Sequence, residues 1–300
     1  MNITILGCHS ASPHEHKNPT AQLLDIKGHR LLIDCGEGTQ VQLRKAKASF
    51  VHIKHIFISH LHGDHFYGLP GLISSFRLLG REAPLHVYGP KGIKDAITLL
   101  LKLANSWTNF PLHFHELSSK KSALIFEDEH VQVHTIPLIH RVYTNGFLFV
   151  EKAGNRRINK EAIKKYTIDK SQFRLLQLGK DVVDNEGKTI LNKLLTLNPH
   201  QPKKYAYCSD TAYNPAMIPL IKGVDLLYHE STFLQQHEQL ATQTQHSTAQ
   251  QAAKIARDAE VGKLILGHYS SRYKDLSIFK DEAQQFFPNI VLASDGLQIS

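Results

Sequence analysis

Short apolar runs recur along the chain at the length of β-strands, and stretches of helical spacing separate them. The run at residues 55–58 is continuous and ends in a polar loop, which predicts a buried strand. Strands with intervening helices, as in the first half of the chain, are typical of one half of an αββα sandwich. The pattern predicts strands at 2–8, 21–26, 30–34, 55–58, 84–88, 111–116, 123–126, 130–136, 146–150, 204–208, 224–228, 263–267 and twice in 290–299, and helices at 39–47, 68–79, 92–104, 249–258 and 275–286.

Length and composition favour one domain over residues 1–300. The chain has 300 residues, of which 42% are hydrophobic, enough to bury one large core or two modest ones. The first residues lack the basic stretch of a signal peptide, and no apolar run approaches the ~18 residues of a membrane span. Cys8, Cys35 and Cys208 are few and widely separated, which is typical of reduced thiols in a cytoplasmic protein.

Residues 151–203 stand apart by their charge. They contain nine lysines and three arginines against three aspartates and three glutamates, which is +6 of the whole chain's +8. Their apolar pattern is weak, so we expect a small excursion from the core, such as a hairpin or a short helix. Clustered cations suit a polyanionic partner. The alternative is a solvated, mobile insertion without a ligand.

The densest chemistry lies directly after the 55–58 strand, in the sequence H-x-H-x-D-H. His60 and His62 can point the same way from an extended backbone, while Gly63 lets the chain turn and aim Asp64 and His65 elsewhere. Imidazole and carboxylate are zinc ligands, and no cysteine lies nearby to form a closed structural site. The spacing therefore predicts a catalytic metal site in which one loop serves two adjacent ions.

This loop is the motif of the metallo-β-lactamase superfamily, and its continuation narrows the resemblance. The segment His65-Phe66-Tyr67-Gly68-Leu69-Pro70-Gly71-Leu72 resembles the ribonuclease Z family, endonucleases that trim tRNA 3′ ends. The resemblance spans essentially the whole chain and is weakest at 151–203. It implies an α/β fold, a four-layer αββα metallo-β-lactamase sandwich with an inserted flexible arm at 151–203.

The resemblance also implies a ligand set for two Zn²⁺ ions per chain, with Mn²⁺ as a substitute. It assigns His60, His62 and His140 to one ion, Asp64, His65 and His268 to the other, and Asp210 as the bridge between them. Two such cations can generate a nucleophile from water at neutral pH. Asp64 is expected to act in catalysis as well, as acceptor of the proton from that water.

Three further positions match family elements. Asp34, in the segment 33–37, is expected to support the metal loop rather than bind metal. For Gly36 and Thr39 in or near this segment, a purely structural explanation, a turn after the strand and an N-cap for helix 39–47, is as good as the family match. His246, oriented by Glu230, is expected to be the general acid. Ser247 or Thr248 is the candidate N-cap of the following helix.

Other histidines are left outside the site. We interpret His9, His14 and His16 as surface histidines, and for His229 a structural role is as well supported as a catalytic one.

In the basic segment the resemblance implies an exosite for tRNA. The candidate contacts are Lys164, Lys165, Arg174 and Lys180. The Pro-Gly-Pro element that bacterial relatives often carry there is absent, and residues 168–174 read Ile-Asp-Lys-Ser-Gln-Phe-Arg instead.

The resemblance finally implies a substrate and an assembly. The substrate is precursor tRNA, cut after the discriminator base to leave a tRNA 3′-hydroxyl and a trailer with a 5′-phosphate, and the enzyme is a homodimer in the cytoplasm without a membrane partner. One alternative is a two-metal hydrolase of a small phosphodiester or other small substrate. Another is a non-catalytic RNA-binding subunit, which the complete ligand set disfavours.

Overall fold

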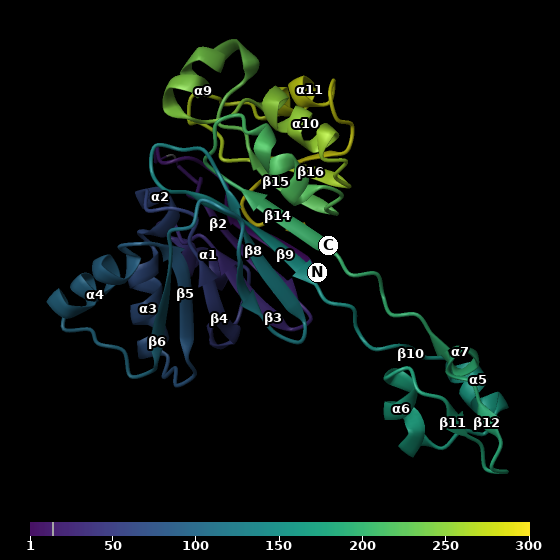
Figure 1. Cartoon of the computed structure of the whole chain (residues 1–300). Helices are drawn as coiled ribbons and strands as arrows, with labels where there is room; N and C mark the ends of the chain where they lie inside the picture. Colours follow the sequence, from purple (N-terminus) through teal and green to yellow (C-terminus); the bar gives the residue numbers. More distant parts are fainter. Residues whose placement is uncertain (14) are drawn as a thin grey trace.

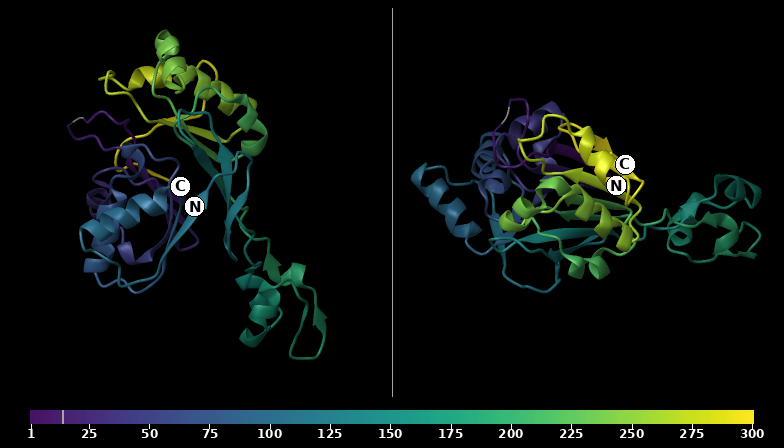
Figure 2. Two further views of the ribbon diagram at one scale, coloured as in Figure 1. Left: turned by 60° about the vertical axis from the view of Figure 1, so that its left-hand side comes forward. Right: turned by 90° about the horizontal axis from the view of Figure 1, so that it is seen from above.

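Two seven-stranded sheets face each other, and helices cover both outer faces (Figures 1 and 2). The computed structural model describes residues 1–13 and 15–300. The four layers confirm the predicted αββα sandwich. The basic segment forms a separate lobe that two extended connecting segments join to the body. No helix in the described part of the chain combines the length and apolar character needed to cross a bilayer.

The first sheet is built almost wholly from the N-terminal third of the chain. Its neighbours from β3 to β6 are parallel, and those from β18 to β3 are antiparallel. The short strand β18 brings the C-terminal residues back to β1, a pairing that the sequence pattern does not predict. In spatial order the strands are β18 (Gln298–Ile299), β1 (Asn2–Gly7), β2 (Ala21–Ile26), β3 (His29–Ile33), β4 (Ile53–Phe57), β5 (Leu85–Pro90) and β6 (Leu112–Leu117).

The second sheet combines an antiparallel half with a parallel half. The strands from β14 to β17 run parallel, and β7, β8, β9 and β14 alternate in direction. In spatial order they are β17 (Ile290–Leu292), β16 (Lys263–Gly267), β15 (Leu226–Glu230), β14 (Lys204–Cys208), β9 (Asn145–Glu151), β8 (Val131–Pro137) and β7 (Leu124–Glu127).

Helices cover the outer face of each sheet. Apolar side chains of α1, α3 and α4 pack in one cluster with the outer face of the first sheet, and those of α10 and α11 join the cluster of the second. The helices are α1 (Thr39–Lys45), α2 (Gly63–Phe66), α3 (Leu69–Leu78), α4 (Ile93–Leu103), α8 (Ile218–Ile221), α9 (Glu238–Thr244), α10 (Ala249–Asp258) and α11 (Ser277–Ala283), with 3₁₀ turns at Phe50–His52, Pro215–Met217 and Gln235–His237.

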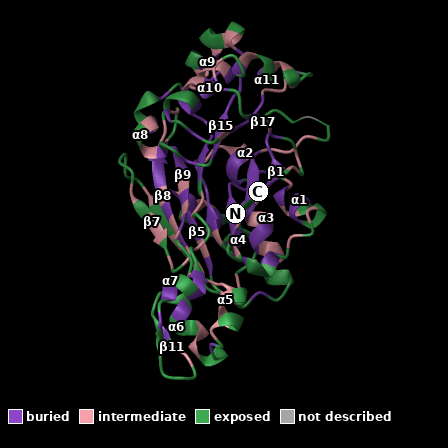
Figure 3. Cartoon of the chain, turned by 90° about the vertical axis from the view of Figure 1, so that its right-hand side faces the viewer, coloured by how far each residue is buried: buried purple, intermediate pink, exposed green. Residues whose placement is uncertain are grey.

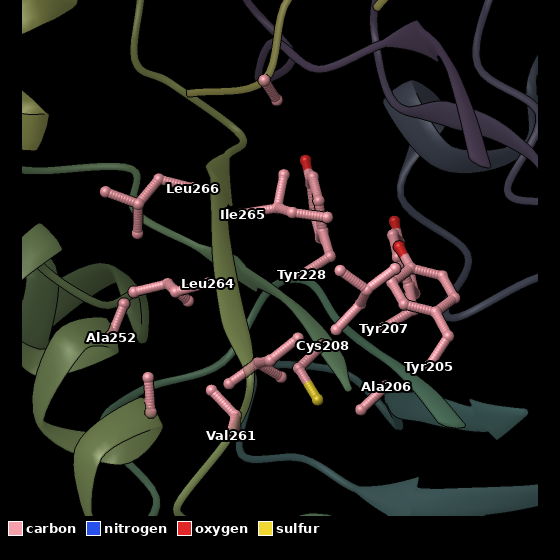
Figure 4. Packing of buried hydrophobic residues seen from close by; sticks show 14 of the residues in the cluster. Tyr205, Ala206, Tyr207, Cys208, Tyr228, Ala252, Val261, Leu264, Ile265 and Leu266 are labelled. Carbon is pink, nitrogen blue, oxygen red and sulfur yellow. The ribbon is translucent and has the colours of Figure 1, made fainter. Parts of the chain in front are cut away.

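The largest core lies between the sheets and under α10. Tyr205, Tyr207 and Tyr228 are fully buried in it. Figure 4 shows Ile265 of β16 on the side of these rings, while Leu264 and Leu266 point to the other side of the strand, where Ala252 lies. Burial raises the pKa of each of these three phenols well above its usual range, so they stay protonated. Figure 3 shows the same pattern over the body, with buried strands between exposed helix faces. This core fixes the strand ends that carry the site.

The basic segment folds around a small core of its own. Ile168, Leu176, Val182, Ile190 and Leu195 are buried together, and this cluster is separate from the two cores of the body. The sequence predicts only a hairpin or a short helix here, so the segment is more structured than expected. It comprises β10 (Arg157–Ile158), α5 (Lys160–Lys165), a 3₁₀ turn (Lys170–Gln172), α6 (Phe173–Gln177), β11 (Val182–Val183), β12 (Thr189–Ile190), α7 (Asn192–Leu195) and β13 (Thr196–Leu197).

Three local expectations change. The predicted helix at 68–79 is preceded by a separate short helix, α2, which carries Asp64 and His65. Thr39 is not the N-cap of α1: Gly38, at φ 80°, takes that place, while the Thr39 hydroxyl donates to the carbonyl of Gly36 over 2.7 Å. Thr248, by contrast, is confirmed as the N-cap of α10, within a capping box completed by the side chain of Gln251.

The loop after β1 also differs in part from prediction. His16 is exposed, as expected. His9 is not a surface residue, since only 8% of it is exposed and its ring lies 5.8 Å from that of Tyr269. His14 lies outside the described residues.

Candidate metal centre

The centre forms where the carboxyl ends of strands from both sheets meet. In the second sheet the parallel register places Cys208 beside His229 and Glu230 beside Gly267, so the segments that follow β14, β15 and β16 leave the sheet together. The loop after β4 approaches from the first sheet, and the Asn145 amide donates to the Ser59 carbonyl across the gap over 3.1 Å. Residues far apart in the chain therefore meet at one edge of the sandwich.

Four of the predicted ligands form one cluster. The ligand atoms of His60, His62, His140 and Asp210 all lie within 4.8 Å of one another. His62 Nδ1 is 3.0 Å from His60 Nε2 and 3.3 Å from His140 Nε2. The Oδ2 atom of Asp210 completes the cluster, 3.5 Å from His60 Nε2 and 3.7 Å from His140 Nε2. The fold thus brings His140 to the loop that follows β4, although 75 or more residues separate them in sequence.

The other predicted ligands form a second cluster beside the first. Asp64, His65 and His268 meet there, with Asp64 Oδ2 3.5 Å from His65 Nε2 and 3.4 Å from His268 Nε2. Asp210 reaches this cluster through its other oxygen, because Oδ1 lies 3.1 Å from His65 Nε2 and 3.1 Å from His268 Nε2. The two oxygens of Asp210 therefore face different clusters, as a carboxylate shared by two ions would require.

Three residues of the centre hold an uncommon backbone conformation. Asp34, Asp210 and His268 each follow a strand and have φ values of 55°, 57° and 60°. Left-handed backbone is uncommon outside glycine and is found preferentially at functional sites. Here it turns the chain sharply after β3, β14 and β16, and the side chains of Asp210 and His268 enter the clusters while that of Asp34 contacts the loop after β4.

The carboxylate of Asp34 supports the loop from below. Its oxygens accept hydrogen bonds from the amide of Ser59 over 2.7 Å, from the Ser59 hydroxyl over 2.9 Å, from His65 Nδ1 over 2.7 Å and from the Tyr207 hydroxyl over 2.6 Å. Asp34 is fully buried and belongs to neither cluster, so the structure agrees with the supporting position predicted from the sequence.

A histidine–glutamate pair lies next to the second cluster. His246 Nδ1 donates to Glu230 Oε1 over 2.7 Å, and the ring of His246 stacks on that of His268 with centroids 5.4 Å apart. The Thr232 hydroxyl donates to the other Glu230 oxygen over 2.6 Å and contacts His268 Nδ1 at 2.9 Å. His229 points elsewhere, and its Nδ1 donates to the Glu230 carbonyl over 2.7 Å, which favours the structural interpretation of that residue.

The electrostatics divide the histidines into two groups. Burial lowers the pKa of His60, His62 and His140, so their imidazoles are neutral at neutral pH and keep a lone pair. For His246, burial lowers the pKa, but the Glu230 carboxylate outweighs it and raises the pKa to about 9. His246 is therefore a cation at neutral pH, which suits a proton donor.

His65 provides a test of whether metal ions fit this site. Its Nε2 is buried and makes no hydrogen bond to any described residue, although three carboxylates surround the ring. Burial lowers the pKa of His65, while Asp210, Asp64 and Asp34 together raise it well above its usual range. Without a metal ion, the negative charge of these carboxylates favours the protonated, positively charged form of His65. A bound cation would supply that positive charge instead. Histidine nitrogens and carboxylate oxygens without cysteine are the donor set of a catalytic zinc site.

A cavity of about 410 Å³ opens over both clusters. His62, Asp64, Asp210, His246 and His268 line it, together with the loop at 10–12 and Arg141. An adjoining cavity of about 500 Å³ shares Ser10, Ala11, Ser12, Gly63 and Asp64 with it. The two cavities therefore adjoin along the loop at 10–12 and the start of α2.

The four predicted substrate contacts do not lie at this centre. Lys164, Lys165, Arg174 and Lys180 are exposed on α5, on α6 and in the turn after it, within the lobe that stands away from the body (Figure 1). None of them forms an ion pair with a described acidic residue, so their charges remain available to a polyanion.

Sequence reasoning missed two residues that organise the centre. The Ser59 hydroxyl lies 3.0 Å from His60 Nδ1 and 3.3 Å from His65 Nδ1, and Thr232 joins Glu230 to His268. Ser59 directly precedes the H-x-H-x-D-H loop, and Thr232 lies two residues after Glu230. This proximity is the one signal in the sequence that pointed to them. Small hydroxyl residues are too common in such loops for that position to identify their role.

Comparisons with known sequences cover the chain from end to end. Residues 1–192 match a family described as anti-Pycsar protein Apyc1, and residues 190–269 match the beta-lactamase superfamily domain. Ribonuclease Z of Porphyromonas gingivalis is 44% identical over 299 residues, which is 100% of this chain and 98% of the relative. Ribonuclease Z of Cytophaga hutchinsonii is 46% identical over 299 residues, 99% of this chain and 95% of the relative.

Solved structures agree with these relatives. The crystal structure of human tRNase Z, short form, superposes with a TM-score of 0.72 at 27% identity, covering 100% of this chain and 99% of that one. The metallo-beta-lactamase fold protein YhfI of Bacillus subtilis gives a TM-score of 0.71 at 18% identity, covering 100% and 99%, which is a likeness of fold alone. The match to the Apyc1 family ends before Asp210, Glu230, His246 and His268, so it carries no information on half of the centre.

Proposed function

The chain belongs to the ribonuclease Z family, and from this premise we propose that it is the endoribonuclease that removes 3′ trailers from precursor tRNA after the discriminator base. The products are a tRNA with a 3′-hydroxyl and a trailer with a 5′-phosphate. The observation that carries the proposal is the convergence of six further candidate ligands around Asp210, next to the His246–Glu230 pair.

The geometry supports two zinc ions per chain as the cofactor, with Mn²⁺ as a substitute. His60, His62 and His140 would hold one ion, Asp64, His65 and His268 the other, and Asp210 would contact both through its separate oxygens. Two such ions supply a nucleophile from water at neutral pH and neutralise negative charge on the phosphate.

The protein's own groups then manage the protons. Asp64 is positioned at the edge of the cavity to accept the proton of the attacking water. His246 is held in place by Glu230 through Nδ1, so as an imidazolium it keeps an Nε2–H to donate to the departing ribose 3′-oxygen. A positioned general acid of this kind contributes roughly 10²–10⁴-fold to the rate. The Glu230 carboxylate stabilises the charged form of His246 and fixes its ring.

The lobe at 151–203 is the candidate site for the body of the tRNA. It carries +6 of the chain's +8 charge, and the exposed cations Lys164, Lys165, Arg174 and Lys180 suit contacts to phosphates, which position a nucleic acid without reading its sequence. The extended connections at either side of the lobe place it away from the centre, as a reach along a tRNA requires (Figure 2).

Two further properties belong to the proposal. A homodimer is supported by apolar side chains exposed on and after α3 and α4, where Leu78, Leu103 and Trp107 are 83%, 75% and 52% exposed. Sedimentation velocity checks it, and a single species at 33.9 kDa would contradict it. A cytoplasmic location is supported by Cys8, Cys35 and Cys208, which are all unpaired thiols in the core.

The decisive experiment maps the 3′ ends produced from a precursor tRNA. The wild-type protein should cut after the discriminator base, and Asp64→Ala should lower the rate by ~10²-fold or more, because one change removes a ligand and the proton acceptor. Asp95→Ala, on the exposed side of α4, is the matched control and should cut normally. Cleavage by the wild type at scattered positions, or none, would sink the proposal.

A further inference from the structure

A second set of metal-ligating side chains lies where the two ends of the chain meet. Cys8 and His9 directly follow β1, and Asp295 lies in the turn that leads to β18. The ligand atoms of these three residues all lie within 4.8 Å of one another. None of them belongs to the centre around Asp210, so the proposed cleavage of RNA gives this cluster no role.

The spacing within the cluster matches zinc coordination. Tetrahedral zinc, with bonds of ~2.3 Å to sulfur and ~2.0 Å to a carboxylate oxygen, holds those two ligand atoms about 3.5 Å apart. Cys8 Sγ and Asp295 Oδ1 are 3.5 Å apart. Thiolate, imidazole and carboxylate are the three ligand types that zinc takes in proteins, and each occurs once here.

Neighbouring groups hold the side chains in this arrangement. Asn18 donates to Asp295 Oδ2 twice, from its amide over 2.9 Å and from its side chain over 2.7 Å, which leaves Oδ1 directed at Cys8. The Cys8 carbonyl accepts from the His268 amide over 2.8 Å, which anchors the backbone. Hydrogen bonds that fix the free oxygen of a ligating carboxylate are the usual support of a metal site.

Cavities open beside two of the three residues. His9 and Asn18 line the cavity of about 500 Å³ that adjoins the main centre, and Asn18 and Asp295 line another of about 610 Å³ on the other side. His9 and Asp295 therefore border open space, while Cys8 is fully buried between them.

We propose that Cys8, His9 and Asp295 bind a divalent transition metal ion of the zinc class at a site separate from the two-ion centre. The Cys8 thiol donates to Asp295 in the metal-free form and loses that proton to solvent as sulfur binds the ion. The bound ion joins the end of β1 to the turn before β18. Because the Cys8 carbonyl holds the His268 amide, it also stiffens the backbone that carries one residue of the main centre.

Cobalt(II) reports on this site directly. The main centre offers only nitrogen and oxygen ligands, so a thiolate-to-cobalt charge-transfer band in the near ultraviolet can arise only from a cysteine site. We expect the cobalt-loaded wild-type protein to show this band, and metal analysis of the zinc-loaded protein to find three ions per chain. Cys8→Ser should abolish the band and lower the metal content by one.

Two further variants complete the test. Cys208→Ala, a buried cysteine that belongs to none of the ligand clusters of the described residues, should keep the band at full strength. Asp295→Asn should weaken cobalt binding without loss of the thiol, and it serves if Cys8→Ser does not fold. A cobalt-saturated wild type that lacks the band, or a band that survives Cys8→Ser, would overturn the proposal. Neither result depends on RNA cleavage, so a failure of this proposal can be distinguished from a failure of the proposed nuclease function.

Discussion

Hydrogen bonds to one ring nitrogen determine which nitrogen each histidine presents to the centre. When Nδ1 is engaged by a neighbour, Nε2 is left to bind an ion, and such neighbours tune the ligand. His140 Nδ1 donates to the carbonyl of Gln245 over 3.0 Å, and Thr232 engages His268 Nδ1. Ser59 and Asp34 do the same for His60 and His65. Four of the five candidate histidine ligands are thus each paired with a group that orients them, whereas His62 directs its Nδ1 into the cluster.

Asp34 is the strongest of these orienting groups, and its replacement should weaken metal binding. In Asp34→Asn the side chain loses a carboxylate that accepts from Ser59, His65 and Tyr207. We expect zinc affinity to fall by ~10–100-fold, which is typical for loss of such a partner. Competition with a chelator measures it. Asp128→Asn, which removes a carboxylate that accepts two backbone amides away from the centre, should leave the affinity unchanged.

Glu230 should determine the alkaline limit of activity through His246. The pKa of His246 is raised to about 9, so the imidazolium donor is present at neutral pH and is lost as the pH rises through that value. The rate of the chemical step should therefore fall above about pH 9. In Glu230→Gln the charge that raises this pKa is gone, so the alkaline limb should move to lower pH. Single-turnover rates against pH measure both.

The same pair makes a contribution to stability with a defined pH window. Because the folded-state pKa of His246 lies above its unfolded value of 6.5, the stabilisation is fully present below that value and is lost as the pH rises through about 9. Denaturant unfolding across this range, compared with Glu230→Gln, checks the direction. If the loss of stability at alkaline pH were the same in Glu230→Gln, Glu230 would not be its cause.

At the scale of the elements, we expect the helices of the lobe to contribute to tRNA binding through their positive charge and to take no part in the cleavage step. Replacing Lys164, Lys165, Arg174 and Lys180 with glutamine should weaken tRNA binding and leave the centre intact. Each lost phosphate contact reduces the slope of log affinity against log salt concentration by ~0.7–0.9. The slope of the fourfold variant should therefore decrease by up to ~3.6. Lys94→Gln with Lys102→Gln on α4 is the matched control, and an equal change there would refute the assignment.

At the scale of the whole molecule, the way in which the lobe is attached should allow it to be deleted without unfolding the body. Its two connections begin at the adjacent ends of β9 and β14, where Lys204 pairs with Val150 and the Glu151 amide donates to the Lys203 carbonyl over 3.0 Å. A short turn in place of residues 153–201 should close this antiparallel pair and keep the body folded, because the lobe has a core of its own. Loss of the lobe thus tests function without loss of the centre.

This deletion discriminates tRNA from a small substrate. We expect cleavage of precursor tRNA to fall by at least ~10-fold through lost phosphate contacts, while hydrolysis of a chromogenic phosphodiester continues. Thermal unfolding and zinc content should match the full chain. If tRNA cleavage survived the deletion, a small phosphodiester would become the better substrate class and the charge of the lobe would need another explanation.

The sequence determined the chemistry of this protein and most of its elements. Apolar periodicity located the strands to within a few residues, since burial of one face is a local property of the pattern. The loop at 60–65 indicated a candidate metal site by itself, because three histidines and an aspartate at this spacing are the ligand types that zinc takes. The structure places Asp34 against the metal loop and pairs Glu230 with His246, two contacts that are expected from the resemblance rather than from geometry.

Only the tertiary structure decided how these pieces meet. No local pattern shows that β18 returns to β1 or that Cys8 lies beside Asp295, because both depend on contacts between opposite ends of the chain. The burial of His9 was invisible for the same reason, because its ring packs beside Tyr269, and the role of Thr232 was invisible because it depends on the neighbouring strand end that carries His268. That Asp210 directs one oxygen to each cluster is likewise a consequence of how two sheets pack, which no stretch of sequence contains.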